Sequence, residues 1–110
     1  QLLGEVDALY IPTDNTLSSA ATTVGDLAIE YQVPIVAGSI DHTAQGGLAT
    51  YGIDYTSLGR QTGQMAVDIL QNGTAPSDIP VETAENLELF VNEDMANALG
   101  IDPESIQLEE

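Results

Sequence analysis

Residues 6–15 read Val6-Asp7-Ala8-Leu9-Tyr10-Ile11-Pro12-Thr13-Asp14-Asn15, an apolar run that stops at a proline and is followed by polar residues. The apolar part predicts a buried strand over residues 6–11. The polar part predicts the start of a helix, because Asp14 or Asn15 can cap its first turn. Ligands of open α/β sheets bind where strands end and helices begin, so this stretch is also a candidate ligand site.

A strand–helix–strand unit follows from this stretch. Between Leu17 and Tyr31 apolar residues recur at three- and four-residue steps, which predicts one amphipathic helix. Residues 33–38 form a short apolar run rich in β-branched residues, which predicts a second strand. The two strands should be parallel and joined by a right-handed crossover, so that Thr13, Asp14 and Asn15 face Ser39. The predicted fold class is α/β, with parallel-sheet βαβ layers.

The remaining chain alternates predicted loops, extended segments and helices. Gly59 and Gly63 lie on one face of the longest predicted helix, where they are expected to allow close packing. Gly73 is the expected left-handed stop of that helix, and Asn92 the expected cap of a later one. The predicted segments are a polar loop at 39–47, an extended segment at 48–54, a helix at 55–72, a connector at 72–80, one or two strands within 81–91, a helix at 93–99 and a turn or helix restarting at 102–104.

The charge of the chain is unusually one-sided. Eighteen acidic residues face a single basic one, Arg60, and the formal net charge is −17. Binding to nucleic acid through phosphates is therefore not expected. Such a charge repels itself at low salt, whereas about 1 M salt shortens the screening length to about 3 Å. A halophilic source is the favoured explanation, and an ordinary acidic protein is the alternative.

Few residues suit catalysis or metal binding. The chain lacks cysteine, and His42 is its only histidine. A Ser/His/Asp triad would have to be built on His42 within a glycine-rich loop, so we interpret His42 as a solvated loop residue. No cofactor and no enzymatic activity are expected. No apolar run approaches the roughly 20 residues that span a bilayer, and no signal peptide is visible at the start.

The order of several stretches resembles a known family. The chain is similar to the C-terminal part of a type I periplasmic-binding-protein fold, in particular to ABC transporter substrate-binding proteins of the tryptophan/tyrosine type. The resemblance covers nearly the whole chain. It is carried by Val6 to Asn15, Val33-Pro34-Ile35-Val36-Ala37-Gly38, Leu48-Ala49-Thr50-Tyr51-Gly52-Ile53-Asp54-Tyr55, Leu58-Gly59-Arg60-Gln61-Thr62-Gly63, and Asn86-Leu87-Glu88-Leu89-Phe90-Val91-Asn92 before Ala96 to Ile101.

The resemblance implies a fragment of a two-lobed binding protein that works with ABC permease subunits. Residues 1–48 would belong to the second, C-terminal lobe. Residues 49–80 would hold a crossover and a helix that packs on the first lobe, and residues 81–110 the return strand or strands and the C-terminal helix. The full-length protein would be extracellular or periplasmic and anchored through an N-terminal lipid. The fragment alone has sheet edges that could pair or exchange strands between copies.

The implied ligand is a small polar solute such as an aromatic or branched amino acid. Its ammonium would pair with Asp14 or Asp54, and its carboxylate would bond Thr13, Asn15, Ser39 and backbone amides. Tyr51 and Tyr55 would stack on its side chain. Each residue also has a structural interpretation: helix capping for residues 13–15 and for Asp54, a turn for Ser39, and a lobe interface for the tyrosines. The rival function is a receiver-like or flavodoxin-like regulatory domain, although a receiver would need a lysine that this chain lacks.

Overall fold

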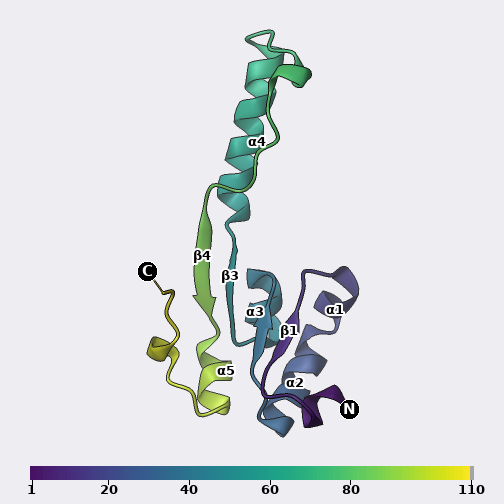
Figure 1. Cartoon of the computed structure of the whole chain (residues 1–110), viewed down its shortest axis with the longest axis vertical. Helices are drawn as coiled ribbons and strands as arrows, with labels where there is room; N and C mark the ends of the chain where they lie inside the picture. The colour runs from purple at the N-terminus through teal and green to yellow at the C-terminus, as the bar shows by residue number, and fades with distance from the viewer. Residues whose placement is uncertain (110) are drawn as a thin grey trace. The chain divides into compact units, whose positions relative to one another are not determined.

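The computed structural model describes residues 1–109 (Figure 1). The chain divides into two compact units, one formed by Gln1–Gly52 with the part from Glu88 onward, and one formed by Ile53–Leu87. The strands are β1 (Leu9–Ile11), β2 (Ile35–Ala37), β3 (Ala49–Ile53) and β4 (Leu87–Val91). The α-helices are α1 (Asn15–Ser19), α2 (Ala21–Tyr31), α3 (Ile40–Gly46), α4 (Tyr55–Leu70) and α5 (Glu93–Ala98), and short 3-10 helices span Leu2–Gly4, Pro76–Asp78 and Pro103–Ser105.

The four strands form one sheet in the order β1-β2-β3-β4 (Figure 1). β1, β2 and β3 are parallel, with Tyr10 opposite Val36 and Val36 opposite Ala49. β4 runs antiparallel to β3, because Asn92 N–H donates to Leu48 O at one end of the pair and Asp54 N–H to Asn86 O at the other. The predicted α/β class and the parallel βαβ arrangement are confirmed.

Helix α2 covers one face of the sheet. Ile11, Ala28 and Ile35 form a buried cluster between β1, α2 and β2, and Leu9 and Val24 pack against it. A second cluster joins the start of β3 to α5 through Leu48, Ala49, Met95 and Ala96. Burial of these apolar side chains contributes about 25 cal/mol per Å² removed from water, so the two clusters fix the helices on the sheet.

Small residues let α2 and α3 approach backbone to backbone. A Cβ added to Gly25 would lie 2.7 Å from Gly46 Cα, and one added to Gly46 would collide with the carbonyl oxygen of Ala21. All three residues are buried. Side chains larger than hydrogen at the two glycines would force the helices apart, since packed interiors leave no room for an extra methyl group.

The prediction of a single helix after β1 is wrong, because the structure has two helices there. α1 ends at Ser19 and α2 begins at Ala21, with Ala20 at φ −105° and ψ 9° between them. The Ser19 hydroxyl donates to Thr16 O at 2.7 Å. Such a bond gives a backbone carbonyl an alternative partner to the helical N–H, which favours a break. The apolar spacing runs through the break, so periodicity alone could not reveal it.

The loop predicted at 39–47 is also wrong, because most of it forms α3. Ser39 caps this helix, and its buried residues include the polar His42 and Thr43. His42 is only 1% exposed, so the interpretation of a solvated loop histidine is corrected. Among residues 1–109 neither ring nitrogen of His42 has a hydrogen-bond partner. A helix that buries polar residues lacks the apolar stripe from which helices are predicted.

The second unit contains α4, whose predicted start at Tyr55 is confirmed. No residue of α4 is buried within the described chain, and a Cβ added to Gly59 or Gly63 would meet no atom within 4 Å. The close packing predicted for these two glycines is thus not present among residues 1–109. Gly73 has φ +68°, the left-handed conformation expected of it. None of the helices in the described part of the chain is long and apolar enough to cross a membrane.

Candidate functional site

Thr13, the first of the predicted site residues, follows β1 and lies against the end of β2. Gly38 follows β2, and its N–H donates to Ile11 O at 2.8 Å. A Cβ on Gly38 would lie 2.7 Å from the backbone nitrogen of Thr13 and 2.8 Å from its hydroxyl oxygen. Thr13 therefore lies directly beside the residue that precedes Ser39. Of the predicted meeting of residues 13–15 with Ser39, the structure shows the approach of Thr13 to Gly38.

Asp14 and Asn15 form the start of α1. Asp14 is the N-cap, and its Oδ1 accepts the Leu17 N–H at 2.9 Å. Asn15 is the first helical residue, and Thr13, Asp14 and Asn15 are all exposed. Asp14 therefore caps α1. Because its carboxylate is exposed, it can also accept hydrogen bonds from further donors.

Ser39 is the N-cap of α3. Its hydroxyl oxygen accepts the His42 N–H at 3.3 Å, and its carbonyl accepts the Thr43 hydroxyl at 2.8 Å. A Cβ added to Gly52 would lie 3.1 Å from Ile40 Cγ1, so the end of β3 lies close to the start of α3. The first unit thus gathers Thr13, Ser39 and Gly52 around the ends of three neighbouring strands.

Tyr51 lies on the partly uncovered face of the sheet, where Ala49 is buried but larger side chains are exposed. It is two residues after Ala49 on β3, and Ala49 is in register with Val36 and, through it, with Tyr10. Residues two apart on a strand share a face. Tyr10, Val36 and Tyr51 are 65%, 45% and 54% exposed, so this face carries large uncovered apolar side chains.

The other two predicted site residues, Asp54 and Tyr55, begin the second unit. Asp54 Oδ1 accepts the N–H groups of Thr56 (3.0 Å) and Ser57 (3.3 Å), and its Oδ2 accepts the Ser57 hydroxyl at 2.7 Å. This hydroxyl is the main reason that the pKa of Asp54 lies below its ordinary value, with smaller contributions from the two N–H groups and from the charge of Arg60. Tyr55 is exposed as the first residue of α4.

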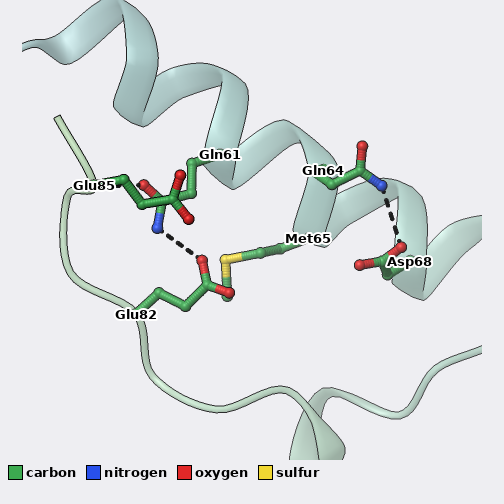
Figure 2. A pocket seen from close by; sticks show the side chains of 6 residues that line it. All are labelled: Gln61, Gln64, Met65, Asp68, Glu82 and Glu85. Atoms are coloured by element: carbon green, nitrogen blue, oxygen red, sulfur yellow. Dashed lines mark hydrogen bonds between the residues drawn. The ribbon is translucent and has the colours of Figure 1, made fainter.

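A pocket of about 200 Å³ lies in the second unit, and none of the predicted site residues lines it (Figure 2). Gln61 Nε2 donates to Glu82 Oε2 at 2.7 Å and to Thr83 O at 2.9 Å, and Glu85 N–H donates to Gln61 Oε1 at 3.3 Å. These bonds hold the returning segment against α4. The pocket is lined by Gln61, Gln64, Met65, Asp68, Glu82 and Glu85.

Neither this pocket nor the close approach of Gly38 to Thr13 was predicted from the sequence. The pocket depends on contacts between residues about twenty positions apart, which no local pattern signals. Gly38 could have been found, since a glycine just after a strand often marks a close approach of backbone. Within residues 1–109 no group of three or more His, Asp or Glu side chains is arranged to hold a metal ion.

Comparisons with known proteins show what this arrangement is similar to. The tyrosine-binding protein of Clostridioides difficile (strain R20291) is 41% identical over 98 residues, which are 89% of this chain and 28% of that protein. The ligand-free, open structure of a substrate binding protein with adhesive properties from Clostridium difficile has a TM-score of 0.76 at 44% identity, covering 92% of this chain and 34% of that one. An ABC domain from Streptococcus pneumonia in complex with L-Trp has a TM-score of 0.78 at 34% identity, covering 93% and 34%.

This chain therefore spans about a third or less of the length of these relatives. The sequence profile described as ABC transporter substrate binding protein matches residues 1–109. The family resemblance drawn from the sequence is confirmed, and the rival assignment to a receiver-like or flavodoxin-like regulatory domain is set aside. Since the match covers nearly all of the sequence, the chain belongs to the family of ABC transporter substrate binding proteins.

Proposed function

We propose that this chain is part of an extracytoplasmic solute-binding protein of an ABC importer, and that the solute is an aromatic amino acid. The observation that carries the proposal is made at the carboxyl ends of β1 and β2, where Thr13 lies beside Gly38 and Ser39 caps α3. Polar side chains and helix starts meet there, as in ligand sites of open α/β sheets. Relatives named for tyrosine binding and solved with L-Trp support the ligand class.

The proposed roles follow from the two charges of a free amino acid. Asp14 pairs with the ammonium, since a carboxylate at a helix start can accept further donors. Thr13, Asn15 and Ser39 bond the carboxylate together with backbone N–H groups at the start of α1. Asp54 is the alternative ammonium partner, although its oxygens already accept three hydrogen bonds. Tyr51 and Tyr55 stack on the ring, and packing between lobes is the alternative for both.

The full-length protein is proposed to have two lobes that close on the solute. In this arrangement residues 1–48 belong to the second lobe, the helix near 55–72 packs on the first, and residues 81–110 return to the second. Two open surfaces support a longer protein. Parallel sheets are normally covered on both faces, whereas this sheet exposes Tyr10, Val36 and Tyr51. Helix α4 likewise buries no residue among those described.

The proposed setting follows from the family. Permease subunits would receive the solute, the protein would lie outside the membrane with a lipid at its N-terminus, and it would catalyse no reaction. The isolated fragment, in contrast, would be prone to edge pairing between copies.

The test is a binding titration of the full-length protein against L-tyrosine, L-tryptophan, L-leucine and L-serine in molar KCl. Asp14→Ser separates charge from capping, because serine keeps a good N-cap but removes the carboxylate. We expect Asp14→Ser to weaken aromatic amino-acid binding by about tenfold or more, as for a lost charged hydrogen bond. Asp54→Ser is the parallel variant for the alternative partner, and Asp26→Ser, on the exposed side of α2, is the matched control.

The outcomes separate the parts of the proposal. If no amino acid of the panel binds, the solute class is wrong. If tyrosine or tryptophan binds and neither Asp14→Ser nor Asp54→Ser changes its affinity, the ammonium assignment is wrong while the ligand class stands. Tyr51→Leu keeps an apolar side chain on the partly uncovered face of the sheet. A loss of affinity confined to aromatic ligands would favour stacking, and a loss of thermal stability without loss of affinity would favour packing.

A further inference from the structure

We propose that Gly38 is a positioning residue for the ligand site, and this proposal rests on the function proposed above. Gly38 lies between the two walls of the candidate site. Gly38 follows β2 and precedes Ser39, the cap of α3. The space that a Cβ of residue 38 would need is filled by the Pro12–Thr13 peptide of the turn after β1.

What requires glycine at position 38 is space. Gly38 is not among the residues with positive φ, which in the described chain are Gln32, Gly73 and Gly100. The backbone there would suit any residue, yet a Cβ would lie 2.7 Å from Thr13 N, 2.8 Å from Thr13 Oγ1 and 3.2 Å from Pro12 C. Contacts under 3.0 Å are essentially never seen at real Cβ atoms, so the backbone of the turn or of position 38 would have to shift.

Two of the three atoms nearest to such a Cβ, Thr13 N and Pro12 C, belong to the backbone and cannot rotate away as a side chain can. Thr13 N is a backbone atom, and Gly38 is held to β1 from the other side by its bond to Ile11 O at 2.8 Å. The displacement would therefore be passed to Thr13 and to Asp14, the cap of α1. The N–H and hydroxyl of Thr13 form no hydrogen bond with other residues of the 1–109 segment, so they are available to a ligand.

The absence of a side chain at Gly38 thus sets where these two donors lie. Pre-organised donors bind a ligand more tightly than donors that must first be moved, because the cost of ordering is already met in the free protein. Gly38 would contribute to affinity in this way without touching the solute. Its effect would pass through Thr13.

The experiment is a double-mutant cycle in the full-length protein, with dissociation constants for L-tyrosine and L-tryptophan as the readout. The variants are Gly38→Ala, Thr13→Ala and the double variant. The matched control is Gly47→Ala, because a Cβ there is also crowded by backbone, 3.0 Å from Thr43 Cα, but does not touch the turn. The amide resonances of Thr13 and Asp14 in the ligand-free protein give a second readout that needs no ligand.

We expect Gly38→Ala to raise the dissociation constant by about tenfold or more, and the double variant to bind no more weakly than the weaker single variant. Gly47→Ala should lower the unfolding temperature while leaving the dissociation constant within about twofold. The Thr13 amide resonance should move in Gly38→Ala and stay in place in Gly47→Ala.

The proposal would be overturned if Gly38→Ala bound as tightly as the unmodified protein, or if the losses from Gly38→Ala and Thr13→Ala simply multiplied. A wild-type protein that binds no aromatic amino acid would count against the proposed function instead. In that case the amide resonances decide: an unmoved Thr13 resonance in Gly38→Ala rejects the positioning role, and a moved one supports it.

Discussion

Asn92 Nδ2 donates to Thr43 O at 3.0 Å, while Asn92 Oδ1 accepts the N–H of Met95 at 3.1 Å. One side chain therefore caps α5 and ties it to α3, which lies 49 residues earlier in the chain. The contact is partly buried, so water competes for it less than at the surface. The cap was expected from the sequence, and the tie to α3 was not.

Replacing Asn92 should separate its two functions. Asn92→Ser keeps a capping oxygen and loses the donor to Thr43 O, and should cost about 1 kcal/mol of unfolding free energy. Asn92→Ala loses both bonds and should cost about 2 kcal/mol. Urea unfolding in molar KCl measures both. Asn97→Ser, at an exposed position of the same helix, is the control and should stay within about 0.5 kcal/mol. Equal costs for Asn92→Ser and Asn92→Ala would mean that the bond to Thr43 O carries the whole effect.

Replacing His42 tests its ring nitrogens, which have no hydrogen-bond partner among residues 1–109. A buried polar atom without a partner costs about 1–3 kcal/mol, so His42→Leu should preserve the unfolding free energy or raise it. His42→Ala removes the ring, leaves a cavity and should cost about 2–4 kcal/mol. The measurement is again urea unfolding. A loss of more than about 2 kcal/mol in His42→Leu would show that the imidazole makes a favourable interaction in solution.

Because of Asp54, the stability of the folded state should change with pH in the acid range. Hydrogen bonds from Ser57 and Thr56 keep its folded pKa below the usual 3.8, so the ionised form stabilises the folded state. This contribution is fully present above about pH 4 and is lost as the pH falls through the folded pKa. The difference in melting temperature between wild type and Asp54→Asn should therefore be constant near neutral pH and shrink in acid.

Calorimetry at several pH values and constant KCl measures this difference. Asp26→Asn is the control, because it removes one negative charge from the same acidic chain at an exposed position of α2. If the melting-temperature difference between wild type and Asp54→Asn changed with pH in the same way as that for Asp26→Asn, a specific effect of the Asp54 hydrogen bonds would be contradicted.

The net charge of −17 should make folding depend on salt. Raising KCl from about 0.1 M to 2 M shortens the screening length from about 10 Å to below 3 Å, and should raise the melting temperature. Changing the exposed Glu5, Glu30 and Glu109 to Gln should reduce that salt dependence. An uncharged osmolyte at equal osmolality is the control for non-ionic effects. A chain that is fully stable at low ionic strength and unaffected by KCl would remove the argument for a halophilic source.

The sequence alone predicted much of the fold, because local patterns carried it. An apolar run ending at Pro12 located β1, a short β-branched run located β2, and parallel pairing followed from the helix between them. Asp14 or Asn15, Asn92 and, as one of two interpretations, Asp54 were expected as helix caps, and Asp14, Asp54 and Asn92 each accept a backbone N–H in the structure. Capping uses a side chain and a backbone group only two or three residues apart, so it can be predicted without tertiary information.

Tertiary structure decided what local patterns could not. Helix α3 has no apolar stripe, since it buries His42 and Thr43, and its packing against Gly25 through Gly46 is a long-range contact that holds it there. The partly uncovered face of the sheet at Tyr51 depends on register between strands far apart in sequence. The contact of Gly38 with Thr13 likewise joins residues that only strand pairing brings together. The sequence therefore determined which residues could line a site, whereas their spacing was set by long-range packing, in which one absent Cβ fixes the position of a backbone donor.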